Sequence, residues 1–332
     1  MTHGMNSSIY QTPEWEQFKL KTGYEKSYRI EDILVLQKKL PFGRTMLYSP
    51  MVSEHQLAGI QNADNRIQKD FVTGIKKVAE ENNAIFYRLE LDIPKELSTF
   101  HFPLSTRNFQ KSFEEMQPEN NWVVDITKTE DEILAQMKQK GRYNIRVAEK
   151  NNIEITSSDK AGKELDVFYD LYSKTGKRKG VTYRGKAYFE NLLDILGKID
   201  YARTYAATAK INSKTVPLAA AVIIFYKKEA LYLYGGSSDE YKNLMAPYLL
   251  HWKIMLDAKE KRIEKYNFLG VAPAGTSPLG EATDDPSHPW AGITRFKKQF
   301  GGEQKDILGS YDLILKPLEY QLFKIAEKIR RK

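Results

Sequence analysis

The stretch from residue 201 to residue 271 constrains the fold more than any other part of the sequence. It contains three short apolar segments joined by polar turns: 203–208, 217–225 and 231–234. β-branched and aromatic runs separated by turn residues at this spacing predict an antiparallel meander. A polar loop then leads to an amphipathic helix at 246–261, and YNFLG at 266–270 returns as a strand. This order predicts a compact α+β layer that a second element must cover.

Length and composition set the outer limits. The chain has 332 residues, of which 41% are hydrophobic, which predicts a sizeable core and two domains rather than one. It contains no cysteine, so disulfides and thiolate chemistry are excluded. The first residues show no basic and apolar leader. The longest apolar run, near 217–226, is about half of the roughly 20 residues that a membrane helix needs. We expect a soluble, cytoplasmic protein with no transmembrane segment.

The first third of the chain has a similar order of elements. A helix is predicted at 13–21, with Thr12 as its N-cap and proline at the first helical position. Strands are expected at 30–37, 45–49 and 84–91, and a long helix at about 53–82. No repeat is visible at the level of residues, so an internal duplication follows from element order alone.

Basic residues concentrate in two places. The net charge is +8, which suits an anionic partner or simply a solvated surface. A single helix is expected after the N-cap Thr129, and four basic residues spaced four apart form a ridge along it: Lys138, Arg142, Arg146 and Lys150. The segment 176–189 is expected to be a glycine-bounded loop with five basic residues, which either clamps phosphate or is simply mobile.

Several chemistries lack their motifs. The five histidines show no paired metal-binding spacing, and His251 is expected to be structural. There is no GxSxG, no P-loop and no GxGxxG, and we expect no metal. The strand, loop and helix at 231–261 invite comparison with GNAT acetyltransferases. However, Asp239 and Glu240 in the loop would repel the pyrophosphate of coenzyme A, which favours a different acyl donor.

Five short motifs, in order, carry a resemblance over nearly the whole chain. They are QTPEW at 11–15, KGRYNIRVAEK at 140–150, YRGKAYF at 183–189, YLYGGS at 232–237 followed by APY at 246–248, and RFKKQFGG at 295–302. With them the chain resembles the Fem family of peptidoglycan interpeptide-bridge aminoacyltransferases, and among these the short members that lack a coiled-coil arm.

The resemblance implies a fold and an activity. The fold would be α+β, with two tandem GNAT-like domains of mixed sheets flanked by helices. The first would comprise residues 1–145 plus 311–332, with the C-terminal helix from about 317 returning to it, and the second residues 146–310. The activity would be transfer of an amino acid from aminoacyl-tRNA to the side-chain amine of the stem peptide of UDP-MurNAc-pentapeptide or lipid II. No cofactor would be needed, and work on lipid II would bring the protein to the inner face of the membrane.

The resemblance also implies roles for residues. Lys297 and Phe296 match a Phe-Lys pair near the aminoacyl ester, and Lys19 and Arg184 match positions that hold the diphosphate of the acceptor. Glu90 falls where such enzymes can have an aspartate near the acceptor amine. Tyrosines that match the lining of the substrate cleft are Tyr188, Tyr232 and Tyr234. Where the family usually has Asp in the strand after the long helix, this chain has Asn267.

Physical reasoning supports a direct transfer. Aminolysis of an ester passes through a tetrahedral oxyanion, which a lysine ammonium such as that of Lys297 can stabilise. Without cysteine or a triad, direct attack by the amine is simpler than a covalent intermediate. Two alternatives stay open at this point: a coenzyme A-dependent N-acyltransferase, and a non-catalytic module that binds tRNA or another anion through the ridge. We also expect Tyr232 and Tyr234 to share one face of their strand.

Overall fold

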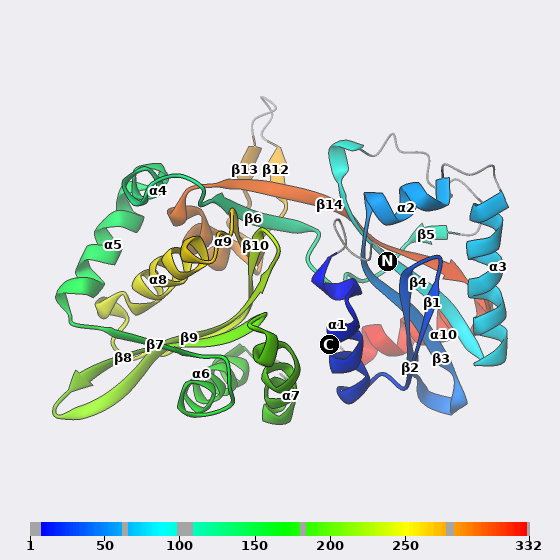
Figure 1. Ribbon diagram of the computed structural model, residues 1–332, viewed down its shortest axis with the longest axis horizontal. Coiled ribbons are helices and arrows are strands. Elements are labelled where there is room, and N and C mark those ends of the chain that lie inside the picture. The colour runs from blue at the N-terminus through cyan, green and yellow to red at the C-terminus, as the bar shows by residue number, and fades with distance from the viewer. Residues whose placement is uncertain (1–7, 62–65, 98–108, 180–183, 277–281, 331–332) are drawn as a thin grey trace. The chain divides into compact units, whose positions relative to one another are not determined.

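The computed structural model describes residues 8–61, 66–97, 109–179, 184–276 and 282–330. Contacts within the chain divide it into two compact units: residues 1–119 with 306–332, and residues 120–305. Each unit contains a mixed sheet with helices packed on it (Figure 1). This confirms the predicted α+β class with mixed sheets flanked by helices.

The first unit is built on a sheet with the order β1-β2-β3-β4-β14, and β5 also pairs with β14. Strands β1, β2 and β3 form an antiparallel meander, and β4 lies parallel to β3 after a helical crossover. The strands are β1 (Lys26–Ile30), β2 (Ile33–Lys39), β3 (Thr45–Ser53), β4 (Ala84–Pro94), β5 (Phe109–Lys111) and β14 (Glu303–Ile314). The helices are α1 (Pro13–Lys21), α2 (Glu54–Gln61), α3 (Arg66–Glu81) and α10 (Pro317–Arg330).

Both faces of this sheet are buried. One face packs against Phe71, Ile75 and Ala79 of α3, and the other contacts Tyr320 of α10. Burial on both faces explains the continuous apolar runs at 33–36 in β2 and 84–87 in β4. Two charged residues of β4, Arg88 and Glu90, are nevertheless fully buried, and Arg88 needs neutralisation.

Arg88 is neutralised by two carboxylates. Its guanidinium donates two hydrogen bonds to Asp312 of β14, at 2.7 and 2.8 Å, and one to Glu114, at 2.6 Å. Tyr320 of α10 also donates to Asp312, at 2.7 Å. Because a bidentate Arg–carboxylate pair is geometrically specific, these bonds fix β14 and α10 against β4.

The second unit has the strand order β6-β11-β10-β9-β8-β7. Strands β8, β9 and β10 form the predicted antiparallel meander, and β11 lies parallel to β10. The strands are β6 (Asn120–Asp125), β7 (Glu154–Ser158), β8 (Ala202–Ile211), β9 (Lys214–Tyr226), β10 (Glu229–Ser237) and β11 (Lys265–Gly270), with a separate hairpin of β12 (Ala274–Thr276) and β13 (Ala282–Asp284). The helices are α4 (Glu130–Gln136), α5 (Gln139–Lys150), α6 (Lys163–Lys179), α7 (Lys186–Leu196), α8 (Ala246–Glu260) and α9 (Ala291–Lys297).

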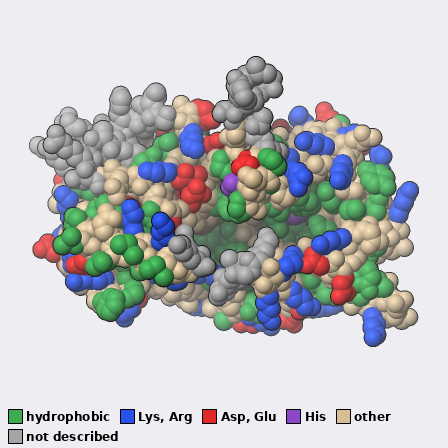
Figure 2. Space-filling view, turned by 180° about the vertical axis from the view of Figure 1, so that it is seen from behind, with side chains coloured by type: hydrophobic (Ala, Val, Ile, Leu, Met, Phe, Trp, Pro, Cys, Tyr) green, Lys and Arg blue, Asp and Glu red, His purple; other side chains and the backbone are tan. Residues whose placement is uncertain are grey.

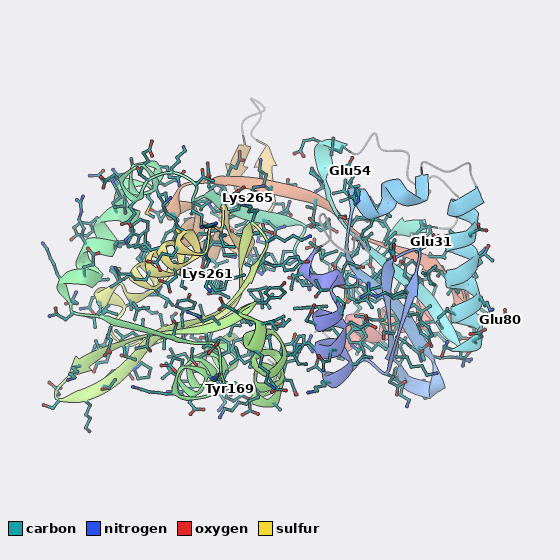
Figure 3. The ribbon with its side chains drawn as sticks, viewed as in Figure 1. Glu31, Glu54, Glu80, Tyr169, Lys261 and Lys265 are labelled. Carbon is teal, nitrogen blue, oxygen red and sulfur yellow. The ribbon has the colours of Figure 1, made fainter. Side chains whose placement is uncertain are left out.

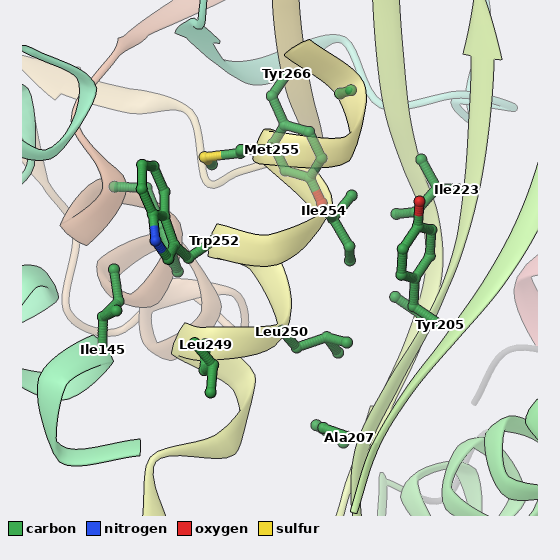
Figure 4. Packing of buried hydrophobic residues seen from close by; sticks show 14 of the residues in the cluster. Ile145, Tyr205, Ala207, Ile223, Leu249, Leu250, Trp252, Ile254, Met255 and Tyr266 are labelled. Atoms are coloured by element: carbon green, nitrogen blue, oxygen red, sulfur yellow. The ribbon is translucent and has the colours of Figure 1, made fainter. Parts of the chain in front are cut away.

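Helix α8 lies between α5 and the sheet. Trp252 is on the side of Ile145 of α5, whereas Leu250 and Ile254 are on the side of Tyr205 and its strand neighbours (Figure 4). Helices α6 and α7 cover the other face of the sheet (Figure 1). Both units therefore show an antiparallel meander, a helix and a parallel strand, which is the tandem GNAT-like arrangement expected from the sequence.

The structure corrects the predicted domain boundary at 145/146. It divides the chain at 119/120, because β6 pairs with β11 and α5 packs against α8. The returning segment begins at Asp306 rather than at 311, since β14 pairs with β4 from Ile307 onward.

The single helix expected after Thr129 is also interrupted. Thr129 does form a capping box with Glu132, but α4 ends at Gln136 and α5 begins at Gln139. The Lys138 N–H donates to the Gln299 carbonyl at 3.0 Å, and a Cβ on Gly141 would collide with that same carbonyl. The Lys298–Phe300 turn therefore occupies the break between the two helices.

Candidate active site

Lys297, the last residue of α9, lies in a mostly enclosed site of the second unit. Only 6% of the residue is exposed. Its ammonium donates to the backbone carbonyls of Leu269, at 3.3 Å, and Gly270, at 2.5 Å. The same nitrogen lies 5.9 Å from the centre of the Tyr232 ring. A positive charge is thus held at a defined point by backbone oxygens and an aromatic face.

A β-bulge presents these two carbonyls. The pairing of β11 with β6 shifts register between Asn267 and Gly270, and Leu269 has a φ of 54°, which is uncommon for a residue other than glycine. The side-chain oxygen Oδ1 of Asn267 accepts the Leu269 N–H at 2.7 Å, and the side-chain Nδ2 of Asn267 donates to the Glu229 carboxylate at 2.9 Å. Bulges commonly re-aim groups near active sites, and here Asn267 holds the bulge that faces Lys297.

Aromatic rings surround the Lys297 site. His251 of α8 lies with its ring centre 4.6 Å from that of Tyr232, 4.9 Å from Phe268 and 5.6 Å from Phe296. Its Nδ1 is 2.8 Å from the hydroxyl of Tyr266. Burial, assisted by the charge of Lys297, lowers the pKa of His251 to about 3, so the imidazole is neutral at physiological pH. The surroundings of Lys297 are therefore apolar and of low dielectric.

Arg184, Tyr188 and Tyr234 form a second cluster. The Tyr188 and Tyr234 hydroxyls are 3.1 Å apart, and the Arg184 guanidinium carbon lies 5.1 Å from the centre of the Tyr188 ring. Burial, followed by the proximity of Tyr188, raises the pKa of Tyr234 well above its ordinary value. Arg184 itself is exposed, so the N–H donors of its guanidinium, which lies over the Tyr188 ring, are accessible to solvent.

The expectation that Tyr232 and Tyr234 share one face of β10 is wrong. The register with β9 shifts between them, so that Tyr232 lies opposite Ile223 and Tyr234 opposite the next residue, Val222. This bulge reverses the alternation on which the expectation rested. Tyr232 packs against His251 on the α8 side, and a Cβ on Gly235 would collide with its hydroxyl.

Tyr234 points to the opposite face of the sheet. Its ring centre lies 5.9 Å from that of Tyr172 in α6 and 5.1 Å from that of Phe189 in α7. The structure thus brings Lys297, Phe296 and Tyr232 together on one face, and Arg184, Tyr188 and Tyr234 together on the other.

Lys19 and Glu90 belong to the first unit. The Lys19 ammonium lies 5.0 Å from the ring centre of Tyr24 and 5.8 Å from that of Trp15. Tyr24 stacks on Tyr48 at 6.3 Å, and the Tyr48 hydroxyl makes a short hydrogen bond to Glu90. The two predicted residues are therefore connected through a pair of tyrosines.

Glu90 is a fully buried carboxyl on β4. Besides Tyr48, it accepts the Gln117 N–H at 2.7 Å and contacts the Ser310 hydroxyl at 3.3 Å. Burial outweighs these hydrogen bonds and raises the pKa of Glu90 to about 7. A carboxyl that titrates near neutrality within a hydrogen-bonded network can exchange a proton.

The predicted basic loop at 176–189 needs correction. Residues 176–179 continue α6, and Lys186 begins α7, where it pairs with Asp166 at 2.6 Å. Arg178 pairs with Asp239 of the loop after β10. Residues 180–183 lie outside the described residues. Among the basic residues expected to form the clamp, Arg184 lies over the ring of Tyr188.

The basic ridge also has a partly structural role. Lys138 is the N-cap residue of α5, and Arg142 donates to the carbonyls of Ala135, at 3.3 Å, and Met137, closing the end of α4. Arg146 and Lys150 are exposed. Figure 2 shows Lys and Arg spread over one face of the molecule among acidic and apolar side chains rather than gathered in one patch.

Within the described ranges, no group of three or more His, Cys, Asp or Glu residues is arranged to hold a metal ion. None of the described helices combines the length and the apolar character that crossing a bilayer requires.

Comparison with known proteins assigns the family. A family model described as the FemAB family matches residues 95–201 and 198–328, which is more than half of the chain. The chain belongs to the FemAB family. This confirms the family to which the sequence motifs point.

A curated relative and two solved structures are similar to the chain over nearly its whole length. The chain is 22% identical to a lipid II:glycine glycyltransferase of Staphylococcus aureus, with 98% of this chain and 96% of the relative covered. A crystal structure of FemX has a TM-score of 0.76 at 21% identity, covering 96% of this chain and 95% of that one. L-PGS from Bacillus licheniformis has a TM-score of 0.53 at 13% identity, covering 93% and 94%. At these identities, the solved structures establish the fold.

Sequence reasoning missed the groups that position Lys297. Asn267 stands out only as an Asn where the family usually has Asp, and nothing in the local pattern marks the bulge that it holds. The coupling of His251 to Tyr266 is equally invisible, because the two lie on different elements. A polar residue within an otherwise apolar helix face was the one available signal for His251.

Proposed function

We propose that this FemAB protein is an aminoacyltransferase that moves an amino acid from aminoacyl-tRNA to the side-chain amine of a peptidoglycan stem peptide. Family membership supports the reaction class, and one relative is named a lipid II:glycine glycyltransferase. The observation that carries the proposal is the Lys297 ammonium, held by the carbonyls of Leu269 and Gly270 in an aromatic, mostly enclosed site.

The chemistry needs little beyond positioning and charge. The amine nitrogen of the acceptor attacks the ester carbonyl carbon, and a tetrahedral oxyanion forms. Collapse of that intermediate breaks the bond to the ribose oxygen, which leaves as a hydroxyl with a proton from the attacking nitrogen. A preorganised ammonium in a low-dielectric site stabilises the developing negative charge without reorganisation. We assign this role to Lys297, with Phe296 and Tyr232 shaping the space beside it.

The acceptor would be recognised through its diphosphate and its sugar-peptide portion. Arg184 presents an exposed guanidinium, and Lys19 supplies a cation set among aromatic rings. Tyr188 and Tyr234 support Arg184, and Glu90 lies behind the tyrosines next to Lys19. Both UDP-MurNAc-pentapeptide and lipid II carry the diphosphate, and use of lipid II would place the reaction at the inner face of the membrane.

The donor would contact the basic ridge. Arg146 and Lys150 are exposed on α5 and suit tRNA phosphates, whereas Arg142 is engaged with the end of α4. Phosphate contacts of this kind weaken with rising salt. Tighter binding of charged tRNA at low salt, reduced by substituting Arg146 and Lys150 together, is therefore expected.

A transfer assay tests the proposal. The purified chain is incubated with a pool of charged tRNAs and either UDP-MurNAc-pentapeptide or lipid II, and products are read by mass spectrometry. We expect one acceptor to gain the mass of one amino acid residue, only when the tRNA is charged. Transfer from an acyl-coenzyme A in a parallel reaction, with none from charged tRNA, would instead identify a coenzyme A-dependent enzyme. The absence of any product would leave a binding module as the better account.

A further inference from the structure

Helix α10 carries an exposed apolar stripe. Four aliphatic residues on one side of it are largely open to solvent: Leu318 at 83%, Leu322 at 67%, Ile325 at 57% and Ile329 at 69%. Their spacing of four, three and four residues places them within roughly 60° of one another around a helix of 3.6 residues per turn. An exposed aliphatic stripe of this kind is typical of an interaction surface.

The opposite side of α10 is the one that holds it to the protein. Tyr320 is fully buried, packs its ring 5.3 Å from that of Phe86 and donates to Asp312. Phe323 lies 5.3 Å from Phe86 as well. Helix α10 therefore has two apolar sides. One packs on the sheet, and the other faces solvent.

Basic residues accompany the stripe. The segment 316–332 contains six Lys or Arg residues and two Glu residues. Both acids are paired, Glu319 with Arg44 at 2.5 Å and Glu327 with Arg330 at 2.5 Å. The segment thus carries six basic against two acidic residues, and two of the basic residues, Lys328 and Arg330, lie in the last turn of α10 together with Ile329. Apolar residues flanked by Lys and Arg are the combination that binds anionic lipid surfaces.

A neighbouring turn adds another exposed apolar residue. Phe42 in the turn Pro41–Gly43 is 99% exposed. Arg44, two residues later, pairs with Glu319 in the first turn of α10, so this turn is close to the start of the helix. Aromatic residues are favoured at the boundary between lipid and water.

We propose that α10 docks the protein on an anionic lipid bilayer, with Leu318, Leu322, Ile325 and Ile329 entering the headgroup boundary. A second copy of the chain is the competing occupant, because the stripe has heptad spacing. Two features disfavour it: the stripe spans only two heptads, whereas a coiled coil needs three or four, and pairing two copies would bring two cationic segments together. A bilayer with anionic headgroups matches both the apolar and the charged parts.

This inference does not rest on the proposed function. A docked α10 would hold the chain where a lipid-linked acceptor resides, but the binding is a property of the helix and can be measured without any transfer. Failure of docking would leave transfer to a soluble acceptor untouched, and failure of transfer would leave docking intact.

Vesicle flotation tests the docking surface. The full chain is mixed with vesicles of phosphatidylcholine alone or of phosphatidylcholine with phosphatidylglycerol. We expect binding to the anionic vesicles, weakened by salt. The double variant Leu322→Ser/Ile325→Ser should lose at least about tenfold in partitioning, since it removes two of the apolar side chains that would leave water. The matched control Leu97→Ser/Ile199→Ser, which changes two exposed aliphatic residues elsewhere, should bind like the unmodified chain.

The charge requirement is tested separately. Lys328→Gln/Arg330→Gln should weaken binding to anionic vesicles and leave circular dichroism unchanged. Equal loss in the Leu97/Ile199 control, or no loss in the α10 variants, would overturn the proposal. It would also be overturned if the chain ignored vesicles and sedimentation showed a dimer that Leu322→Ser/Ile325→Ser converts to a monomer, since the stripe would then join two copies.

Discussion

Replacing Asn267 by alanine should disconnect Lys297 from its carbonyl acceptors. The Asn267 side chain bridges the Leu269 N–H and the Glu229 carboxylate, at 2.7 and 2.9 Å. The N–H that this side chain accepts belongs to a residue in the left-handed region, because Leu269 has a φ of 54°. Without the amide the bulge relaxes toward regular strand geometry, and the carbonyls of Leu269 and Gly270 turn away from the ammonium.

The magnitude follows from the groups involved. Asn267 is 8% exposed, so its loss leaves the Leu269 N–H without its acceptor, which costs about 1–3 kcal/mol for a buried polar group. Relaxing a strained left-handed residue returns about 1–2 kcal/mol. The net loss of stability should therefore be small, about 1 kcal/mol, whereas the site loses its geometry. A displacement of this kind can lower a rate by about 100-fold.

The assay separates stability from turnover. Urea unfolding should place Asn267→Ala within about 1 kcal/mol of the unmodified chain, while the single-turnover transfer rate falls and the affinity for the acceptor is kept. Asn151→Ala is the control, since its exposed side-chain amide donates to the Val147 carbonyl in its own helix, and both quantities should stay unchanged. An unaltered transfer rate in Asn267→Ala would refute the positioning role of the bulge.

Three further predictions concern Asp312, Glu90 and the two tyrosines of β10. Asp312→Ala should destabilise the protein to urea by about 3–5 kcal/mol, because Arg88 would be left as a buried, undercompensated charge. Glu90 has a folded-state pKa of about 7 against an ordinary 4.5, so its stabilising contribution is fully present below pH 4.5 and is lost as the pH rises through 7. Glu90→Gln should remove this loss, on the order of 3 kcal/mol, from the pH profile of unfolding. Tyr232→Phe and Tyr234→Phe should combine additively in transfer rate, within about 0.5 kcal/mol, because they lie on opposite faces.

Each of these predictions has a contradicting result. Lys174→Ala, which breaks an exposed pair with Asp170, should cost less than about 0.5 kcal/mol, and an Asp312→Ala effect of that size would show that Arg88 is solvated. A pH profile unchanged by Glu90→Gln would place its pKa near the ordinary value. Strong coupling between the two tyrosines would indicate one shared site.

The sequence predicted correctly those elements that residues close together in the chain determine. Helix α1 has the predicted bounds, 13–21, because Thr12 accepts the Trp15 N–H and proline starts the helix. The meander β8–β10 follows from β-branched runs separated by turns. His251, expected to be structural, is buried on α8.

Features that depend on distant partners were not readable. The strand expected at 30–37 is broken at Glu31 and Asp32, both at positive φ, in a hairpin turn without glycine or asparagine (Figure 3). The gap between α4 and α5 depends on Gln299, which is far away in the sequence. The bulge between Tyr232 and Tyr234 depends on packing against two different layers, so strand periodicity assigned these tyrosines to the same face.

The candidate site shows the same division. The motifs located Lys297, Phe296, Arg184 and Tyr188, and each lies in a cluster with other residues of the proposed site. The groups that hold these side chains could not be predicted. The Lys297 ammonium, for example, is held by backbone carbonyls in a bulge, and every residue type has such a carbonyl. Asn267 is the clearest case, because its side chain bonds the Leu269 N–H within the bulge and the carboxylate of Glu229 on the neighbouring strand.

The most direct test of the account is the single-turnover rate of Lys297→Met. The substitution removes the ammonium and keeps most of the side-chain volume in the site beside Tyr232. We expect the rate of transfer from charged tRNA to fall by about 100- to 1,000-fold, as when one oxyanion-stabilising donor is removed. The exposed-lysine control Lys305→Met should transfer normally. Full single-turnover activity in Lys297→Met would contradict the assignment of Lys297 as the group that stabilises the oxyanion.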